Sequence, residues 1–507
     1  MTAPTRKFNG RALQCRPPTV PAHSAHARQR ARRRAVFLIG AFALAGCAAA
    51  AQQQTAVPTV VRGTGAASGR SAEPVATTIA LATFDTAWSR IARLHYDSTF
   101  NGVDWDAVRQ ELRPRAAAAA TIGALRAVVS GMLERLGESH YALIPGESAD
   151  AIEPGEESDT TPSGVPGDVG MSVRVVGGLV VVTRIDPSGA AAAAGVRPGW
   201  AVERIGEQSL GDALERLFEL EGAERRIAST RFVFRVNEML TGDAGTVASL
   251  RFLDGEDRRV TLDLTRRPRP GEPVRFGNLP AFFAVLKHER IVVDGACVGV
   301  IRFSVWMLPL AAAFDQAIDD VRDCDGVVID LRGNPGGVAG MVMGVAGHFF
   351  DEVTPLGILR SRGTELKLVA NPRLVNRAGQ RVEPFAGRVA ILTDAASVST
   401  SEIFAAGMQS NRRARIFGDT TAGQALPAVA VRLPNGDVLM HVIADLTGPD
   451  GRRIEGSGVA PDVMVPLTRA GLLAGHDAPL EAAIRWIAGR PAARRMGTLQ
   501  VPSPALR

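Results

Sequence analysis

The chain has 507 residues, of which 46% are hydrophobic and 22% charged; this length predicts several domains, and the composition excludes a disordered, collagen-like or polytopic membrane protein. The formal net charge of +6 originates at the N-terminus, because residues 1–46 hold nine Lys or Arg and no Asp or Glu, which leaves 58 − 9 = 49 basic and 52 acidic residues, a net of −3. The basic excess therefore gives no case for nucleic-acid binding.

A short apolar run follows the basic tract at residues 35–43, and Leu-Ala-Gly-Cys follows at residues 44–47. A cationic region, a short apolar run and small residues before a cleavage point are typical of a secretory signal peptide. The four residues also resemble a bacterial lipobox, so we expect a lipoprotein signal peptide at residues 1–46 and lipidation of Cys47. A plain signal peptide in which Cys47 is incidental is the alternative. Ala48 is not an acidic retention residue, which favours a periplasm-facing lipoprotein of the outer membrane in the bacterial envelope.

Helical periodicity begins after a segment of low complexity. Residues 47–80 are rich in Ala, Gln, Thr, Gly and Ser, which predicts a flexible tether to the membrane. From Phe84 to Leu143 apolar residues return at intervals of three and four, which predicts a helical N-terminal domain at residues 81–150. An acidic stretch with Pro, Gly and Ser at residues 153–166 then predicts a linker.

Short β-like runs replace the helical pattern in residues 167–268. They lie at residues 171–176, 179–184, 246–253 and 260–264. The glycine-containing segments at residues 170–173, 185–190 and 194–200 resemble those of a PDZ domain, although Trp200 stands where Asp is usual. A helical insertion over residues 211–240 makes this PDZ-like domain atypical, and a small β-barrel with a Gly-rich turn is the alternative.

The PDZ resemblance implies a carboxylate-binding loop formed by Gly170, Met171, Ser172 and Val173. In that family the backbone N–H groups of the loop bind the C-terminal carboxylate of a peptide. The bound peptide also adds a strand to the edge of the sheet. We therefore expect the domain to recognise substrate C-termini.

Strand and helix signals alternate through residues 280–490. Strands are expected at residues 298–303, 327–331 and 389–392, and helices at residues 310–321 and 401–408. This alternation is typical of a layered α/β domain built from βαβ units.

Two cysteines in this last domain have similar settings. Cys297 and Cys324 each lie two residues before a glycine that opens an apolar strand. If the two strands are parallel neighbours, both thiols lie at the same end of the sheet, and an exported protein could oxidise them. A disulfide and a pair of free, partly buried thiols are both compatible with the sequence.

Three polar turns could carry chemistry. Residues 330–337 follow a buried strand, and their glycines would let backbone N–H groups approach a developing oxyanion; a tight turn is the alternative. Residues 394–402 join a strand to a helix and place serines at the positive end of that helix; simple N-capping is the alternative. Residues 453–462 form a turn with a carboxylate at Glu455, for which a surface loop is the alternative.

Together, and behind a PDZ-like domain, these motifs resemble the tail-specific (C-terminal processing) protease superfamily, which includes the tricorn-type peptidases. The resemblance covers about residues 84–490. It implies a multidomain α/β fold with a helical N-terminal domain, a PDZ-like β domain and a core related to ClpP and crotonase. It places the nucleophile at Ser399 and the oxyanion donors at the N–H groups of Thr400 and of Gly336 or Gly337.

The residue at the general-base position differs from that of one branch of this family. Relatives in the processing-protease branch use a lysine in a Thr-x-Gly-Lys motif, whereas this chain has glutamine at Gln424 in the matching Thr-Ala-Gly-Gln. Gln cannot accept a proton, and Lys287 and Lys367, the lysines after the leader, fall in no matching motif.

The tricorn-type branch offers another base, a histidine preceded by serine, which corresponds to Ser139 and His140 here. In that branch a glutamate in a Glu-x-x-Gly-Val-x-Pro-Asp segment completes the relay, and Glu455 matches it. Imidazole suits the base role because its pKa lies near working pH, and a hydroxyl and a carboxylate would orient it. A merely structural or orienting His140 is the alternative.

The sequence as a whole predicts an exported, membrane-tethered serine peptidase that works through an acyl-enzyme and recognises substrate C-termini. The alternative is a catalytically inactive lipoprotein scaffold that binds peptides or apolar ligands on the same fold. Peptide or protein substrates and a membrane, reached through the lipid anchor, are the expected partners, with no nucleic acid. The remaining histidines show no ligand spacing, so we expect no metal and no cofactor.

Overall fold

The computed structural model describes residues 68–150 and 164–489. The expected signal peptide at residues 1–46, the lipidation site Cys47 and most of the expected linker lie outside these residues. No described helix combines the length and apolar character needed to cross a membrane.

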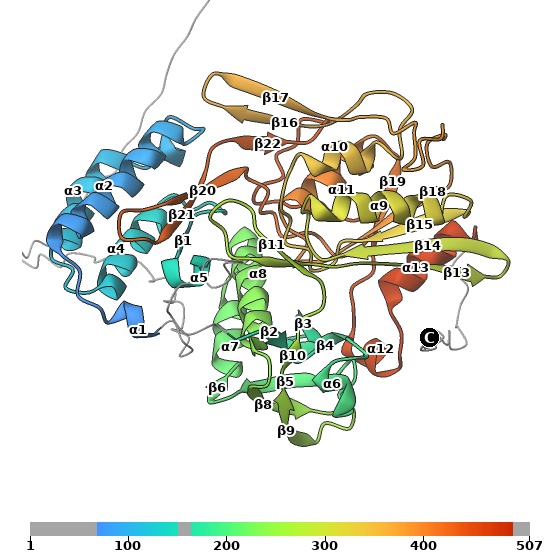
Figure 1. Cartoon of the computed structure of the whole chain (residues 1–507), viewed down its shortest axis with the longest axis horizontal. Helices are drawn as coiled ribbons and strands as arrows, with labels where there is room; N and C mark the ends of the chain where they lie inside the picture. The colour runs from blue at the N-terminus through green and yellow to red at the C-terminus, as the bar shows by residue number, and fades with distance from the viewer. Residues whose placement is uncertain (1–67, 151–163, 490–507) are drawn as a thin grey trace, which may run out of the picture. The chain divides into compact units, whose positions relative to one another are not determined.

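The N-terminal part is helical, as the sequence predicts. Its elements are α1 (Ser68–Ser71), α2 (Thr77–Leu94), the 3-10 turn η1 (Phe100–Gly102), α3 (Trp105–Ala117), α4 (Ile122–Glu134) and α5 (Gly146–Asp150) (Figure 1). Each long helix buries one apolar stripe; α4, for example, buries Leu125, Val129 and Met132.

The flexible tether expected at residues 47–80 extends too far, because its last residues belong to the helical domain. Residues 68–80 are not extended chain, because they include α1 and the first turn of α2. The N–H of Val75 donates to the carbonyl of Ala120 (3.2 Å), and the N–H of Ile122 donates to that of Glu73 (2.9 Å). Ala80 is fully buried, so this segment packs with the helical domain instead of linking it to the membrane.

The β-rich part contains two small sheets and two inserted helices. Its elements are β2 (Pro166–Asp168), β3 (Met171–Val176), β4 (Leu179–Ile185), α6 (Ala190–Ala193), β5 (Ala201–Ile205), β6 (Gln208–Ser209), α7 (Gly211–Glu219), α8 (Gly222–Met239), β7 (Thr241–Asp243), β8 (Val247–Leu253), β9 (Arg259–Thr265) and β10 (Arg267–Pro268). The larger sheet has the order β3-β4-β5-β8-β9, with β6 paired to β5, and is antiparallel. β3 is therefore an edge strand, and the expected helical insertion consists of α7 and α8.

A six-stranded sheet forms the centre of the C-terminal part. It runs β13 (Leu286–Val293), β14 (Ala296–Phe303), β15 (Gly326–Asp330), β18 (Arg388–Thr393), β19 (Ala414–Gly418) and β23 (Val463–Met464), parallel except for β13. Helices α9 (Pro309–Asp320), α10 (Met341–Ala346) and α11 (Thr400–Ser410) cover one face, and α13 (Ala478–Ile487) covers the other (Figure 1). Burial on both faces explains the continuous apolar runs of the central strands.

Smaller elements surround this core. They are β1 (Ala142–Ile144), β11 (Glu272–Val274), β12 (Phe282–Ala284), β16 (Thr354–Ser361), β17 (Thr364–Ala370), β20 (Ala428–Arg432), β21 (Val438–Val442), β22 (Asp445–Thr447) and α12 (Arg469–Leu473). β1 pairs with β21, so the segment after the N-terminal helices joins a sheet of the C-terminal part. This pairing brings the turn at Ser139 and His140 to the core.

The two cysteines lie where parallel neighbouring strands would place them. β14 and β15 are parallel, with Val298 opposite Gly326. Cys297 and Cys324 are joined by a disulfide with an S–S length of 2.01 Å.

Candidate active site

Ser399 lies in the turn between β18 and α11 and is the N-cap residue of α11. Its backbone has φ 57° and ψ −116°, a conformation that serine rarely adopts. Its N–H donates to Glu402 Oε2 (3.0 Å) and to the carbonyl of Gln424 (2.9 Å), which fixes the turn. Backbone strain held by its surroundings, at the positive end of a helix, is a feature of functional sites.

The glycine turn after β15 packs directly on Ser399. A Cβ atom added to Gly336 would lie 2.7 Å from the Cβ of Ser399 and 2.9 Å from the backbone N of Thr400. The N–H of Gly336 already donates to Asn334 Oδ1 (3.0 Å), so of the two expected donors, Gly336 or Gly337, Gly336 is paired within its own turn. Among the described residues, no acceptor is paired with the N–H of Gly337 or of Thr400.

Ser139, His140 and Glu455 form a hydrogen-bonded relay. The hydroxyl of Ser139 lies 2.7 Å from His140 Nδ1 and 3.0 Å from Glu455 Oε2, and the N–H of Ser139 donates to Glu455 Oε1 (3.0 Å). The hydroxyl of Ser139 has one proton. When this hydroxyl donates a hydrogen bond to the carboxylate, its oxygen accepts a hydrogen bond from Nδ1–H of His140. This tautomer leaves the Nε2 lone pair of His140 available as a base.

The surroundings of His140 keep it neutral. Burial, assisted by the positive charge of Arg231 on α8, lowers the pKa of His140 to about 4. Burial also raises the pKa of Glu455, although the N–H groups of Ser139 and Ala425 oppose this rise. At neutral pH the imidazole can therefore accept a proton.

One loop connects Ser399 to the relay. The carbonyl of Gln424 accepts from Ser399, and the N–H of the next residue, Ala425, donates to Glu455 Oε2 (2.9 Å). No hydrogen bond joins Ser399 to His140 within the described residues. Catalytic hydrogen bonds are often long without substrate and tighten when it binds.

Glu402 is a site residue that the sequence reasoning missed. Its buried carboxylate accepts from the hydroxyl of Thr421 and from the N–H groups of Gly423 (2.7 Å) and Gln424 (2.9 Å). Burial raises the pKa of Glu402 to about 7 against these hydrogen bonds. The Ser-Thr-Ser-Glu segment signalled a helix cap but not this link to the loop of Gln424.

Gln424 itself occupies the position of the lysine in the other branch of the family. Its side-chain Nε2 is buried and has no hydrogen-bond partner among the described residues. The amide is therefore placed within the loop that holds Ser399, but a carboxamide is not basic and cannot act as a general base.

The predicted carboxylate-binding loop is partly occupied. The N–H of Gly170 donates to Asp168 Oδ1 (2.8 Å), and that of Val173 donates to Asn237 Oδ1 (3.1 Å). Met171 and Ser172 lie in β3, opposite Ile185 and Arg184 of β4. Two of the four expected N–H donors are thus already paired within the chain.

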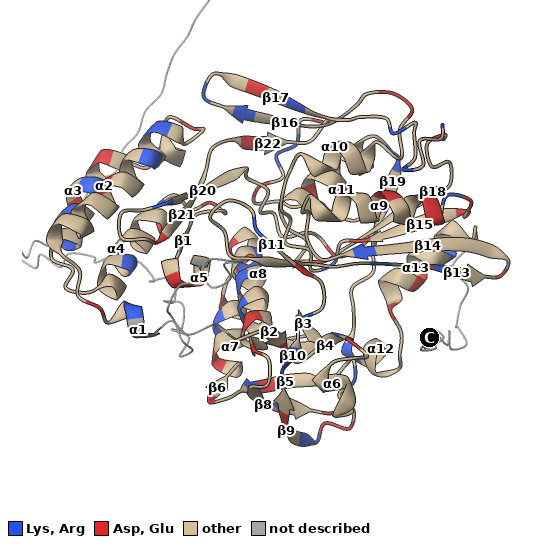
Figure 2. Ribbon diagram, viewed as in Figure 1, with Lys and Arg blue, Asp and Glu red and all other residues tan. Residues whose placement is uncertain are grey.

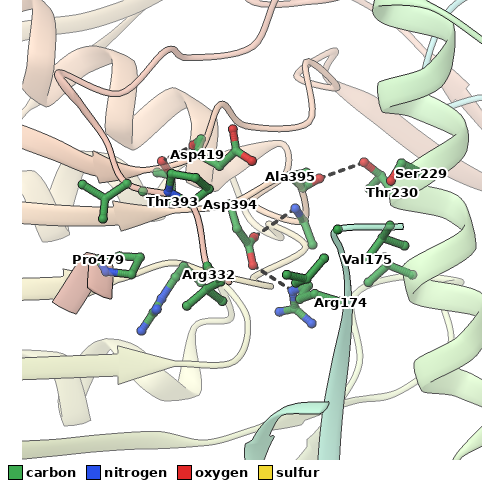
Figure 3. Close-up of a pocket in the computed structure, with 18 residues that line it drawn as sticks. Arg174, Val175, Ser229, Thr230, Arg332, Thr393, Asp394, Ala395, Asp419 and Pro479 are labelled. Carbon is green, nitrogen blue, oxygen red and sulfur yellow. Dashed lines mark hydrogen bonds and ion pairs between the residues drawn. The ribbon is translucent and has the colours of Figure 1, made fainter. Parts of the chain in front are cut away.

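A cavity of about 180 Å³ separates β3 and α8 from the end of β18 (Figure 3). Asp394, at its wall, accepts from Arg174 Nε (2.7 Å) through Oδ2 and from the N–H of Gly333 (2.9 Å) through Oδ1. The cavity does not include Ser399 or His140, so Asp394 fixes a turn beside the site. No group of three or more His, Cys, Asp or Glu side chains in the described part could hold a metal ion.

Two family models match the chain. Residues 297–465 match peptidase family S41, and residues 81–134 match the tricorn protease C1 domain. These two matches bear out the resemblance to the carboxyl-terminal-processing proteases and their tricorn-type relatives. The chain is accordingly a serine-type peptidase of the carboxyl-terminal-processing kind, as the motifs around Ser399 predict.

Curated relatives of this peptidase agree with that kind. Carboxyl-terminal-processing peptidase 2, chloroplastic, from Arabidopsis thaliana is 25% identical over 397 residues, which are 76% of this chain and 68% of that protein. The C-terminal processing peptidase, chloroplastic, from Tetradesmus obliquus is 25% identical over 396 residues, which are 75% and 76% of the two chains.

Solved structures show the same fold. The photosystem II D1 C-terminal processing protease has a TM-score of 0.52 and 20% identity, and covers 79% of this chain and 98% of its own. Mature CPAF has a TM-score of 0.52 and 13% identity, and covers 81% and 96%. The mixed α/β architecture expected for this chain is therefore confirmed, whereas its PDZ-like domain stays a prediction.

Proposed function

We propose that the chain is an exported peptidase in which Ser399 attacks a peptide carbonyl and His140 acts as the general base. The observation that carries this proposal is the relay from Glu455 through Ser139 to His140, attached to Ser399 by residues 424–425. It supplies the base that a serine hydroxyl needs at neutral pH in a chain whose loop lacks the lysine.

The proposed reaction has two halves. His140 Nε2 takes the proton of Ser399 Oγ while Oγ bonds to the carbonyl carbon, and the resulting oxyanion accepts hydrogen bonds from the N–H groups of Thr400 and Gly337. The C–N bond then breaks, and the leaving amine takes the proton from His140. A water molecule, deprotonated by the same nitrogen, hydrolyses the acyl-enzyme and restores Ser399.

The proposal extends to where the substrate comes from. The basic leader and the Leu-Ala-Gly-Cys segment support export and lipid anchoring at Cys47, so the substrates would be envelope proteins. The PDZ-like domain, through the edge of β3, would present their C-termini to Ser399. The names of the curated relatives, which describe processing at carboxyl termini, agree with this substrate class.

Covalent labelling tests the proposal. A fluorophosphonate should modify Ser399 in the purified protein and in the remote control Ser361→Ala, and should not modify Ser399→Ala. His140→Ala should react about 10² to 10⁴ times more slowly, because a positioned base contributes that factor. Peptide mapping by mass spectrometry identifies the adduct. A folded protein without an adduct on Ser399 would instead fit the inactive scaffold.

A further inference from the structure

The edge of β3 is not open. Val173 uses both of its outward backbone groups: its N–H donates to Asn237 Oδ1 (3.1 Å), and its carbonyl accepts from Asn237 Nδ2 (3.2 Å). A carboxamide carries one donor and one acceptor side, like a peptide unit. Asn237 thus makes the two contacts with β3 that a residue of an added strand would make.

Asn237 is held in this place by its own helix. Its Nδ2 also donates to the carbonyl of Val233 (2.7 Å), one turn earlier in α8. Val236 is 1% exposed and belongs to the apolar core of the β-rich part. α8 is therefore packed onto this domain along the edge of β3, although it is rich in arginine (Figure 2).

The other half of α8 contacts the catalytic side. The hydroxyl of Thr230 donates to the carbonyl of Ala395 (2.8 Å), in the turn that leads to Ser399 (Figure 3). The guanidinium of Arg226 donates to the carbonyl of Gly456, the residue after Glu455. One helix thus contacts the peptide edge and both turns of the candidate site.

We infer that α8 is a built-in occupant of the peptide edge of β3, and that a substrate C-terminus must displace Asn237 before it can add to that strand. This inference rests on the proposed role of β3 in peptide binding. The inference includes a movement of α8 together with Asn237, which would loosen the contacts of Thr230 and Arg226 beside the catalytic turns. Peptide binding at β3 and loosening of the α8 contacts beside the catalytic turns then occur together.

A competition experiment tests this inference on the mature chain. The probe is a pool of fluorescein-labelled peptides that end in Leu-Ala-Ala with a free carboxylate, followed by fluorescence anisotropy. Asn237→Ala removes two hydrogen bonds to β3 and should bind the pool about tenfold more tightly than the wild type. Thr230→Val, which removes only the far contact, should bind it several-fold more tightly, and the matched control Asn376→Ala should behave as the wild type.

Hydrogen exchange gives an independent reading of the same edge. The β3 amides should exchange faster in Asn237→Ala than in the wild type and become protected again when the peptide pool is bound. Thermal unfolding followed by circular dichroism shows that each variant is folded. Equal peptide affinity in the wild type, Asn237→Ala and Thr230→Val, including no binding by any of them, would overturn the inference, as would fast exchange of β3 in the wild type.

Fluorophosphonate labelling of the same samples separates the two proposals. Labelled Ser399 with unchanged peptide affinity would overturn the role of α8 alone. Unlabelled Ser399 in every folded variant would overturn the peptidase mechanism, while the anisotropy result would still decide whether α8 covers the peptide edge.

Discussion

Ser399 has a backbone conformation that costs about 1–3 kcal/mol for a residue with a side chain. Two acceptors, Glu402 Oε2 and the carbonyl of Gln424, share its N–H and hold it there. Glu402 also binds the N–H of Gln424, so the same carboxylate fixes the turn of Ser399 and the loop beside it. The strain at Ser399 is thus offset by contacts that also organise the site.

His140 shows how burial, assisted by a neighbouring charge, can set the pH range in which a histidine is neutral. Its pKa of about 4 lies below the ordinary value of 6.5, so the folded protein keeps the imidazole neutral where a free histidine would be protonated. Between these two values the unfolded chain binds more protons than the folded one. The contribution of His140 to stability is therefore complete above pH 6.5 and is lost as the pH falls toward 4.

The same pKa predicts the acid limb of activity. The rate of Ser399 labelling in the wild type should fall only near pH 4, because His140 stays neutral above that pH. Arg231→Gln removes the positive charge and should move the limb to higher pH, whereas Arg235→Gln on the same helix should not. Labelling rates measured across pH check this. An acid limb between pH 6 and 7 in the wild type would mean that His140 is not the base.

At the scale of elements, the glycine turn after β15 sets how closely two loops approach. Gly336 has φ 91° and lies against both Ser399 and Thr400, so a side chain there would meet backbone as well as Cβ atoms. The N–H of Gly336 donates to Asn334 Oδ1, so Gly337 is the glycine of this turn whose N–H has no acceptor among the described residues. The turn packs on the candidate site, and Gly337 is its proposed donor to the oxyanion.

Gly336→Ala should therefore slow Ser399 labelling by at least about tenfold and lower the free energy of unfolding by about 1–3 kcal/mol. Gly340→Ala is a matched control, because a Cβ at Gly340 meets nothing within 4 Å. Labelling kinetics and urea unfolding measure the two effects. Unchanged labelling of Gly336→Ala would show that the turn does not shape the site.

The strands of the core could be predicted from the sequence, whereas the contacts within the site could not. β15 and β18 are buried on both faces, so they read as apolar runs whose ends are marked by polar turns. Ser139 and Glu455 are 316 positions apart, and only the family resemblance joined them before the structure did. Composition and spacing carry no information about such a distant pair.

The inserted helix α8 illustrates a different limit. Its helical character could be predicted, but its arginines give no single apolar face that would tell where it packs. Asn237 is an ordinary helix residue by sequence, and its pairing with Val173 depends on the edge of a sheet formed elsewhere.

At the scale of the whole molecule, the candidate site is built from parts that lie far apart in the sequence. The N-terminal helices share an apolar core with Leu439 and Val442 of β21, and β1 adds a strand beside them. The proposed base His140 thus lies in the N-terminal part, and the proposed nucleophile Ser399 lies in the C-terminal part. Folding of either part alone would leave the candidate site incomplete.

The disulfide acts at this scale too. It joins Cys297 and Cys324, which are 27 positions apart, and a loop of this length corresponds to about 3 to 4 kcal/mol of stabilisation through the unfolded state. The double variant Cys297→Ser/Cys324→Ser should lose that amount in urea unfolding. A reductant should have the same effect on the wild type and none on the variant. Equal midpoints for the wild type with and without reductant would contradict the prediction.

Gln424 has a consequence for how this chain could evolve. Its buried side chain stands where the resemblance to the processing-protease branch implies lysine, and Glu402 already binds the backbone of its loop. The codons CAA and CAG become AAA and AAG through a change of one base, so a point mutation would place an amine in a loop that is already built. A lineage that took this step would hold the proposed base His140 and a lysine amine at the same time.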